Sequence, residues 1–421
     1  MDRPDSDRRT QVDAALSGNE TRTVARNAAF AAERSVATKK AAWRRQSGYT
    51  PVGFDTVRSQ GMPITFTPIA ECAQTQPFAQ CHGVDLSQAL AARDIERIRA
   101  GLLNHGLLVF GDQRAMAPEH EVAFNRAFGW HDPDQSAFLF GFGAPTTEHR
   151  VSGGAQLPAW PEVSVLGNVK LDDHHGVTNT QLKPILGFTY AGWHADGLHD
   201  MFDGLPELTT MYNPVGWQTR GGGATYFTSG VRAIERMDPD LARELARCTV
   251  AYMRCPNDDA PDETRRVAPG VSRMTDEATR RAGFAMNRDD PDAGLADFDL
   301  SPEHAEGSGR HRCIRVHPLT GQPSLYVTPG LAVCLLDCET GAMRHGVDDT
   351  VDLLARALRP SVGPDIRYEH AWREGDFVAW INTLVLHSAT DPSEIDGPRL
   401  MHRVRLSTPK TRWANGRYLS L

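Results

Sequence analysis

The sequence has no long apolar run and no excess of basic charge. No apolar stretch approaches the ~18 residues that a membrane-spanning helix requires, so we expect no membrane partner. The chain carries 45 Lys and Arg against 53 Asp and Glu, a formal net charge of −8. Because nucleic-acid binding demands a concentrated basic surface, this balance argues against a nucleic-acid partner.

Paired cysteine motifs are also missing. The seven cysteines are scattered and odd in number, none forms a Cys-x-x-Cys pair, and no secretory signal is recognisable before them. We therefore expect a reducing, cytoplasmic setting. Hydrophobic residues make up 40% of the chain, which is enough for a sizeable core in a soluble protein. Assembly as a homo-oligomer is compatible with the sequence, which does not decide it.

Two segments differ in composition from the rest. Residues 22–45 hold seven basic side chains and the single acid Glu33, after a start rich in aspartate. We interpret residues 1–60 as a basic and polar extension, partly helical or mobile; the acidic start argues against a transit peptide. Residues 255–312 are rich in Asp, Pro and Arg and are too polar to form a core of their own. We predict that they form a surface insertion, which could act as a lid.

Local patterns predict three helices outside these segments. An apolar stripe indicates the first, Pro118 suits the first turn of the second, and Asp238 followed by Pro239 can cap the third. They are expected over 91–104 with Gly106 as the stop, from Pro118 to before Gly129, and from Pro239 onward with Leu241 and Leu245 facing inward.

The pair His194 and Asp196 is the most informative feature that is present. On a β-strand, residues two apart point the same way, so this imidazole and this carboxylate could share one small cation. Two imidazoles and one carboxylate on one face of an octahedron form a mononuclear iron site with three open positions. The pair by itself occurs often by chance, so a third ligand is needed.

His387 is the best candidate for that ligand. It lies near the end of 375–388, an apolar and aromatic run that reads as a buried strand delivering a polar side chain. A histidine there needs a partner, and a metal is one, although such a residue is more often a satisfied core histidine. Arg399, twelve residues further on, offers a planar fork of donors that matches a carboxylate. The three signals together indicate iron and 2-oxoglutarate.

At this point the chain resembles the taurine and 2,4-dichlorophenoxyacetate dioxygenases (TauD/TfdA family), which depend on Fe(II) and 2-oxoglutarate. The resemblance extends from about Gly83 to Leu406 and has its motifs in the family's order. Besides the site residues, it is carried by Gly83–Ser87, Leu103–Gln113, Phe124–Gly129, Gly222–Phe227, Arg315–Gly321, Ser324–Val327 and the Trp380-Ile-Asn382 segment.

The resemblance implies roles for individual residues. His194, Asp196 and His387 would bind Fe(II), and Arg399 with Thr225 would hold the distal carboxylate of 2-oxoglutarate. In the family the second arginine of the closing strand often meets an anionic group of the substrate. That arginine would be Arg403 here, unless it forms only a surface salt bridge.

Two positions depart from the family's pattern. Ala224 stands where the family has Asp in Gly-Gly-Asp-Thr, and Ile381 where it has Asp in Trp-Asp-Asn. Neither position is an implied metal ligand, so the chemistry should be kept while hydrogen bonding behind the ligands differs. Asp196 itself favours hydroxylation, since related iron halogenases have a small residue there that leaves room for chloride.

These observations predict one catalytic domain over 61–421, because residues from 194 to 403 must converge on one ion. We expect a mainly β fold with flanking helices (α+β), built on a double-stranded β-helix of the jelly-roll or cupin-like kind. The expected function is oxidation, in the first place hydroxylation, of a small organic substrate that can be anionic, with 2-oxoglutarate and O2 consumed and succinate and CO2 released. Two alternatives stay open: a non-catalytic barrel that only binds small molecules, and a cupin-type metal dioxygenase that does not use 2-oxoglutarate.

Overall fold

The computed structural model describes residues 63–128, 139–140, 154–182, 192–196, 204–252, 310–317, 320–329, 332–390 and 394–409. The predicted extension 1–60 lies outside them. The predicted insertion 255–312 also lies outside them, apart from its last three residues, which form the strand β12 (Arg310–Arg312).

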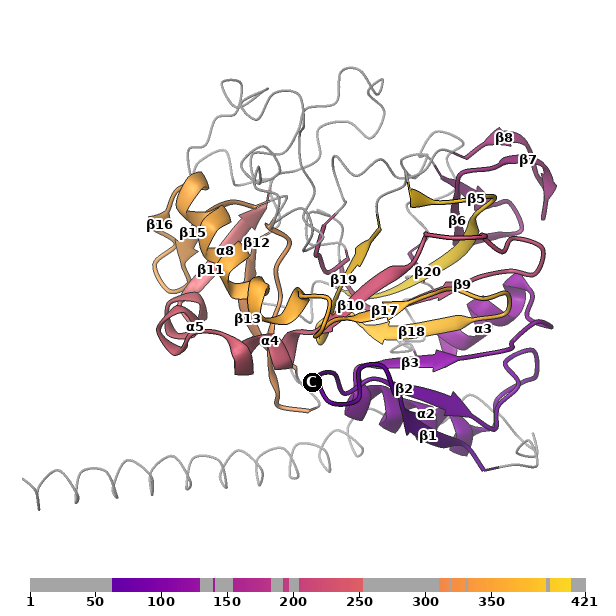
Figure 1. Cartoon of the computed structure of the whole chain (residues 1–421), viewed down its shortest axis with the longest axis horizontal. Coiled ribbons are helices and arrows are strands. Elements are labelled where there is room, and N and C mark those ends of the chain that lie inside the picture. Colours follow the sequence, from indigo (N-terminus) through magenta and orange to yellow (C-terminus); the bar gives the residue numbers. More distant parts are fainter. Residues whose placement is uncertain are drawn as a thin grey trace, which may run out of the picture. The chain divides into compact units, whose positions relative to one another are not determined.

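The larger sheet of the described chain contains nine strands, and its order interleaves early and late segments (Figure 1). Along the sheet the order is β1-β2-β3-β18-β9-β20-β6-β5, and β4 pairs with β20. The bounds are β1 (Thr65–Pro68), β2 (Ala79–His82), β3 (Leu107–Phe110), β4 (Leu139–Phe140), β5 (Ala155–Leu157), β6 (Trp160–Gly167), β9 (Gly204–Tyr212), β18 (Phe377–Ile381) and β20 (Leu400–Pro409).

Continuous apolar runs place two strands in the middle of this sheet. All five residues of β18 and all four of β3 are buried, as expected for strands covered on both faces. The strand β18 pairs antiparallel with β3 on one side and with β9 on the other. The next strand in the order, β20, pairs with β9 and with β6. The last strand of the described residues is therefore held inside the sheet.

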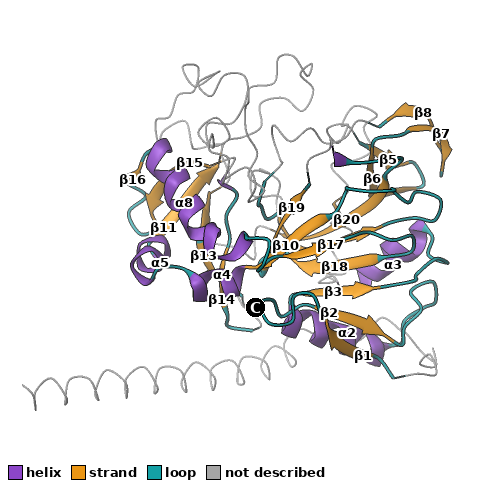
Figure 2. Cartoon of the chain, in the orientation of Figure 1, coloured by secondary structure: helices purple, strands orange, loops and turns teal. Residues whose placement is uncertain are grey.

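The three predicted helices are confirmed. Helix α2 spans Ala92–His105 and ends at Gly106, whose backbone has φ 72°, and α3 spans Pro118–Phe128. Both pack against the nine-stranded sheet (Figure 2). Helix α5 spans Pro239–Ala246, and the Asp238 carboxylate accepts hydrogen bonds from the first-turn amides of Asp240 and Leu241.

The remaining described elements form smaller sheets and a second group of helices. Their bounds are β17 (Tyr368–His370), β10 (Thr225–Ser229) and β19 (Val385–Ala389) in a three-stranded sheet; β11 (Cys248–Tyr252), β15 (Ala332–Asp337) and β16 (Met343–His345), which join β12 in a four-stranded sheet; the pairs β13 (Ile314–Val316) with β14 (Pro323–Leu325) and β7 (Lys170–His174) with β8 (Val177–Gln181); and the helices α4 (Gly230–Arg236) and α8 (Val347–Val362).

Two predictions about strands were wrong in detail. The predicted strand 375–388 is two strands, β18 and β19, separated by a turn at 382–384, and the two belong to different sheets. His387 consequently lies within β19 and not at the end of a longer strand. His194 forms only an isolated β-bridge, and Asp196 lies in a turn, so the pair is not on a regular strand. An apolar run does not reveal where the chain changes sheets.

Two hydrophobic cores meet beside these segments. Trp380 and Val385 belong to the core of the nine-stranded sheet, whereas Trp193, Ala195 and Leu386 pack into the core around α8 and β11. Residues that alternate with Trp193, Ala195 and Leu386 therefore face away from that second core.

The mainly β architecture with flanking helices agrees with the predicted class. No described helix has the length and apolar character needed to cross a bilayer.

Candidate metal centre

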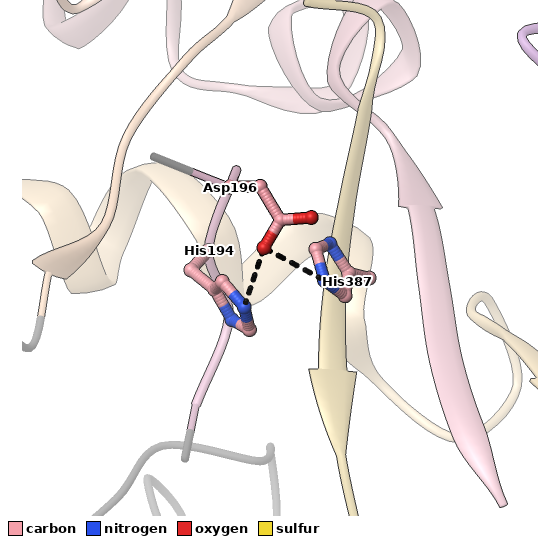
Figure 3. Close-up of side chains that lie close together, drawn as sticks. All are labelled: His194, Asp196 and His387. Carbon is pink, nitrogen blue, oxygen red and sulfur yellow. Dashed lines mark ion pairs between the residues drawn. The ribbon is translucent and has the colours of Figure 1, made fainter. Parts of the chain in front are cut away.

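His194 and His387 are held together by their own backbones. Each donates its amide N–H to the other's carbonyl over 2.9 Å, which forms an antiparallel bridge between the 192–196 segment and β19. The flanking side chains Trp193 and Ala195 are buried in the second core, so His194 and Asp196 turn to the other side. Figure 3 shows the two imidazoles and the carboxylate of Asp196 pointing toward one another.

The three side chains fit a small cation. One carboxylate oxygen of Asp196, Oδ1, lies 3.9 Å from Nε2 of His194 and 3.9 Å from Nε2 of His387. All three ligand atoms lie within 4.8 Å of one another. Metal bonds to imidazole nitrogen and carboxylate oxygen are about 2.1 Å long, so atoms 3.9 Å apart can share one ion. Two imidazoles and one carboxylate are the donor set of mononuclear iron sites.

Burial sets the protonation of these ligands. His387 is buried, and this burial, with the positive charge of a protonated His194 nearby, lowers the pKa of His387 to about 3. Burial acts to raise the pKa of Asp196, but the charges of His387, Arg403 and Arg405 outweigh it and lower the pKa. A neutral imidazole and an ionised carboxylate are the forms that bind a metal.

The orientation of the two imidazoles is fixed in different ways. Nδ1 of His194 lies 2.7 Å from the carbonyl oxygen of Gly192, so it carries the proton and leaves the lone pair on Nε2. His387 packs against two aromatic rings, with centroid distances of 4.9 Å to Trp380 and 6.1 Å to Phe227. Among the described residues, Nδ1 of His387 has no hydrogen-bond partner.

Arg399 lies just before β20, and Asn168 fixes its backbone. The Asn168 side chain accepts from the amide of Arg399 over 2.8 Å, and the Asn168 amide donates to the Arg399 carbonyl over 3.1 Å. Burial lowers the pKa of the guanidinium to about 10, so it stays charged near neutral pH. Within the described ranges, no carboxylate pairs with this guanidinium.

Gly222 and Gly223 let the segment before β10 pack closely against residues 394–399. Both have positive φ, 67° and 71°. A Cβ at position 223 would lie 3.0 Å from Cδ of Arg399, and a Cβ at position 222 would collide with the carbonyl of Glu394. The arginine side chain is thereby brought against the residues that precede Thr225.

Thr225 lies on the same face of β10 and β19 as His387. His387 pairs with Phe227, and Thr225 is two residues before Phe227, which makes Thr225 and His387 diagonal neighbours about 7–8 Å apart. The buried hydroxyl of Thr225 accepts from Nε1 of Trp372 over 2.9 Å. Since a hydroxyl also has one hydrogen to donate, Thr225 can still donate to a carboxylate.

Two further arginines of β20 lie on the side of the metal centre. Nη1 of Arg403 is 3.9 Å from Oδ1 of Asp196, and the Arg403 side chain is 13% exposed. Arg405 is two residues further along β20, so it points to the same face. It pairs in register with Thr209, whose hydroxyl donates to Asp196 over 2.8 Å. The sequence had drawn attention to Arg403 but not to Arg405.

His174 and His175 do not reach the centre. Nε2 of His174 lies 2.8 Å from Nε2 of His402, whose other ring nitrogen meets Glu121 of α3. His402 alternates with Arg403, so this cluster occupies the opposite face of β20, and His175 contacts it. His199 lies outside the described residues.

A second group with metal-ligand chemistry, Glu244, Cys248 and His345, is already engaged by a cation. Arg344 donates to both carboxylate oxygens of Glu244 over 2.8 Å. His345 Nε2 is also within 2.8 Å of that carboxylate. These contacts satisfy the carboxylate without a metal.

Sequence reasoning missed several residues that surround the centre. Asn168, Thr209, Trp372 and Arg405 were not identified, because a polar residue within a strand does not show which face or neighbour it will have. Asn382 was noted only as part of the Trp380-Ile-Asn382 segment, which was the one available signal for its position.

Comparison with known proteins identifies the family to which the chain is similar. The model of the family "Taurine catabolism dioxygenase TauD, TfdA family" matches residues 65–405. The alpha-ketoglutarate-dependent xanthine dioxygenase xan1 of Schizosaccharomyces pombe is 26% identical over 83% of this chain and 89% of its own. The corresponding enzyme xanA of Emericella nidulans is 26% identical over 72% of this chain and 85% of its own.

A solved structure shows the same architecture. The crystal structure of a putative alpha-ketoglutarate-dependent taurine dioxygenase from Burkholderia xenovorans matches with a TM-score of 0.52 and 22% identity. The match covers 82% of this chain and 90% of that protein. The predicted jelly-roll, or double-stranded β-helix, fold is confirmed.

Proposed function

Because the chain belongs to the taurine catabolism dioxygenase TauD, TfdA family and is a 2-oxoglutarate-dependent dioxygenase, we propose that His194, Asp196 and His387 hold its Fe(II). The observation that carries this assignment is the position of Asp196 Oδ1, 3.9 Å from Nε2 of each histidine. Placed in this way, the three residues would hold the ion from one side and leave its other side for co-substrates.

Arg399 and Thr225 are the proposed holders of the distal carboxylate of 2-oxoglutarate. A buried guanidinium favours an anion beside it, and the Thr225 hydroxyl has a hydrogen to donate. Thr225 lies on the face of His387, two residues along β10 from Phe227, and the Arg399 side chain lies against Gly223, two residues before Thr225. A five-carbon keto acid that chelates the metal at one end would place its other carboxylate toward this pair.

The chain's own residues prepare the site for oxidation of the substrate. When bound, Fe(II) supplies activation of O2 coupled to conversion of 2-oxoglutarate to succinate and CO2. Burial keeps His387 neutral, and Trp380 and Phe227 keep water from its ring. Asp196 is held ionised, against the effect of its burial, by the guanidinium charges of Arg403 and Arg405. These features fix the charge and position of the ligands before any co-substrate binds.

For the substrate we propose a small organic molecule with an anionic or acceptor oxygen near Arg403 and Arg405. The guanidinium of Arg403 is beside the metal ligand Asp196, and an arginine fork suits carboxylate, sulfonate or ring carbonyl oxygens. Two similar proteins are named xanthine dioxygenases, and xanthine is a planar molecule with carbonyl oxygens and acidic N–H groups. Xanthine is therefore the first compound to test, followed by carboxylates and sulfonates.

The test is an anaerobic titration of 2-oxoglutarate into the Fe(II)-loaded protein. We expect the weak visible charge-transfer band of the metal–keto acid chelate, and loss of that band in His387→Ala and Asp196→Ala. His174→Ala, which removes a histidine from the opposite face of β20, is the matched control. A protein that binds neither Fe(II) nor 2-oxoglutarate would be a binding module, and one that binds Fe(II) without the band would be a different metal dioxygenase.

A substrate panel scored by succinate then addresses specificity. Succinate release that depends on one added compound identifies the substrate class. If no carboxylate, sulfonate or oxopurine raises succinate above the substrate-free rate, the proposed role of Arg403 and Arg405 is wrong.

A further inference from the structure

The two oxygens of the Asp196 carboxylate have different neighbours. Oδ1 faces His194 and His387, whereas Oδ2 accepts a hydrogen bond from the Thr209 hydroxyl over 2.8 Å. Thr209 lies on β9 and is fully buried. Oδ2 is thus engaged by a hydrogen bond of the protein, whereas Oδ1, which also lies 3.9 Å from Nη1 of Arg403, faces the two imidazoles.

Asn382 determines the direction of the Thr209 hydroxyl. Nδ2 of Asn382 donates to Oγ1 of Thr209 over 2.5 Å, so the Thr209 hydrogen is directed to Asp196. The side-chain oxygen Oδ1 of Asn382 accepts hydrogen bonds from Nε1 of Trp380 over 3.1 Å and from the backbone amide of Asp196 over 3.4 Å. These two donors fix which end of the Asn382 side chain is oxygen.

The network is rigid because strands position its members. Trp380 on β18 pairs in register with Thr209 on β9, and Asn382 begins the turn after β18. Trp380, Thr209 and Asn382 are each at most 1% exposed, and Asp196 is 4% exposed. A buried, fully paired chain of hydrogen bonds has little freedom to rearrange.

We propose that Thr209 and Asn382 are positioning residues that restrict Asp196 to coordination through one oxygen. The proposal rests on the assignment of Asp196 as an iron ligand. A carboxylate can bind a metal through one or both oxygens, and binding through both would take a further position. With Oδ2 held by Thr209, that position stays free for co-substrates. The Trp380-Ile-Asn382 segment thereby acquires a role, although its Ile381 departs from the family's pattern.

The experiment measures the free coordination position with nitric oxide. In the Fe(II) and 2-oxoglutarate complex, Thr209→Val removes the donor at nearly constant volume and is expected to weaken nitric oxide binding about tenfold, read from the electron paramagnetic resonance signal of the complex. Loss of a hydrogen bond to a charged group has an effect of about this size. Thr209→Ser keeps the hydroxyl and should restore the affinity.

Thr210→Val is the matched control. Thr210 is the next residue on β9 and is equally buried, but its hydroxyl contacts the Val404 carbonyl and Asn125 on the opposite face. A merely structural loss would affect Thr210→Val as much as Thr209→Val. If both variants, or neither, weaken nitric oxide binding, the proposal is overturned.

Two outcomes separate this proposal from the assignment of function. Absence of the 2-oxoglutarate band in the wild-type protein would refute the function itself. A normal band in Thr209→Val, with nitric oxide binding equal to wild type, would refute only the positioning role. If Thr209→Val does not fold, Asn382→Ala provides the test, since it leaves the Thr209 hydroxyl without its fixed direction and should weaken nitric oxide binding in the same sense.

Discussion

Nε1 of Trp372 donates to the hydroxyl of Thr225 over 2.9 Å, so the hydroxyl hydrogen of Thr225 is available for another acceptor. If that acceptor is the distal carboxylate of 2-oxoglutarate, Thr225→Val should raise the dissociation constant of 2-oxoglutarate about tenfold. Thr225→Ser should stay near the wild-type value. Trp372→Phe frees the Thr225 hydroxyl to rotate and should raise the dissociation constant of 2-oxoglutarate less than Thr225→Val does. Titration by the visible chelate band measures all three constants, and an unchanged value in Thr225→Val would contradict the assignment.

Arg399 should dominate the affinity for 2-oxoglutarate. Removal of its charge by Arg399→Gln leaves a buried carboxylate without its partner, and we expect the dissociation constant to rise by about 100-fold or more. Arg399→Lys should recover only part of the loss, because an ammonium lacks the planar fork of donors.

The control for Arg399 is an arginine of similar chemistry outside the site. Arg220 is exposed and pairs with Asp396 at 2.6 Å, so Arg220→Gln should leave 2-oxoglutarate binding unchanged. Equal losses in the Arg220 and Arg399 variants would indicate a general charge effect and would remove Arg399 from the site.

The sequence predicted the members of the site better than the way they are brought together. His194, Asp196 and His387 were identified from spacing and residue type, and the structure places them around one point. The expected strand for His194 and Asp196 is only a single bridge followed by a turn. Alternation still holds, because burial of Trp193 and Ala195 in the second core orients their neighbours. Tertiary packing therefore orients His194 and Asp196 toward the same side, which strand geometry was expected to do.

Helix ends were predictable because their signals are local, as Gly106 and the Asp238 cap show. The break between β18 and β19 was not predictable, since both strands are apolar and buried and the turn at 382–384 has no glycine or proline. Thr209 and Arg405 escaped notice for a related reason. Their importance comes from cross-strand register, which a single sequence does not contain.

Arg403 and Arg405 should affect the substrate and not the co-substrate. We expect Arg403→Gln to raise KM for the substrate about tenfold or more, while the dissociation constant of 2-oxoglutarate stays within about twofold of wild type. Arg405→Gln should act in the same direction, because Arg405 shares the face of Arg403 on β20. Initial rates of succinate release against substrate concentration provide KM. A change confined to 2-oxoglutarate binding would show that these arginines do not contact the substrate.

The buried His317 should make the stability of the metal-free protein depend on pH. Burial, helped by the charge of Arg315, lowers the pKa of His317 from 6.5 to about 4. Between these values the unfolded chain binds a proton that the folded chain does not. The free energy of unfolding therefore falls as the pH drops from 6.5 to 4, by about 3 kcal/mol at most from this residue.

The variant His317→Gln cannot take up that proton, so it should show a shallower loss of stability over this pH range than wild type. Urea unfolding at pH 7, 5.5 and 4.5, followed by circular dichroism, gives the free energy of unfolding at each pH. Thr178→Ala, at an exposed position and without an ionisable group, should keep the wild-type slope. The comparison uses the difference between variant and wild type, because His370, whose pKa burial also lowers, contributes in the same direction to both proteins. Parallel curves for wild type and His317→Gln would show that His317 is not held neutral in the folded state.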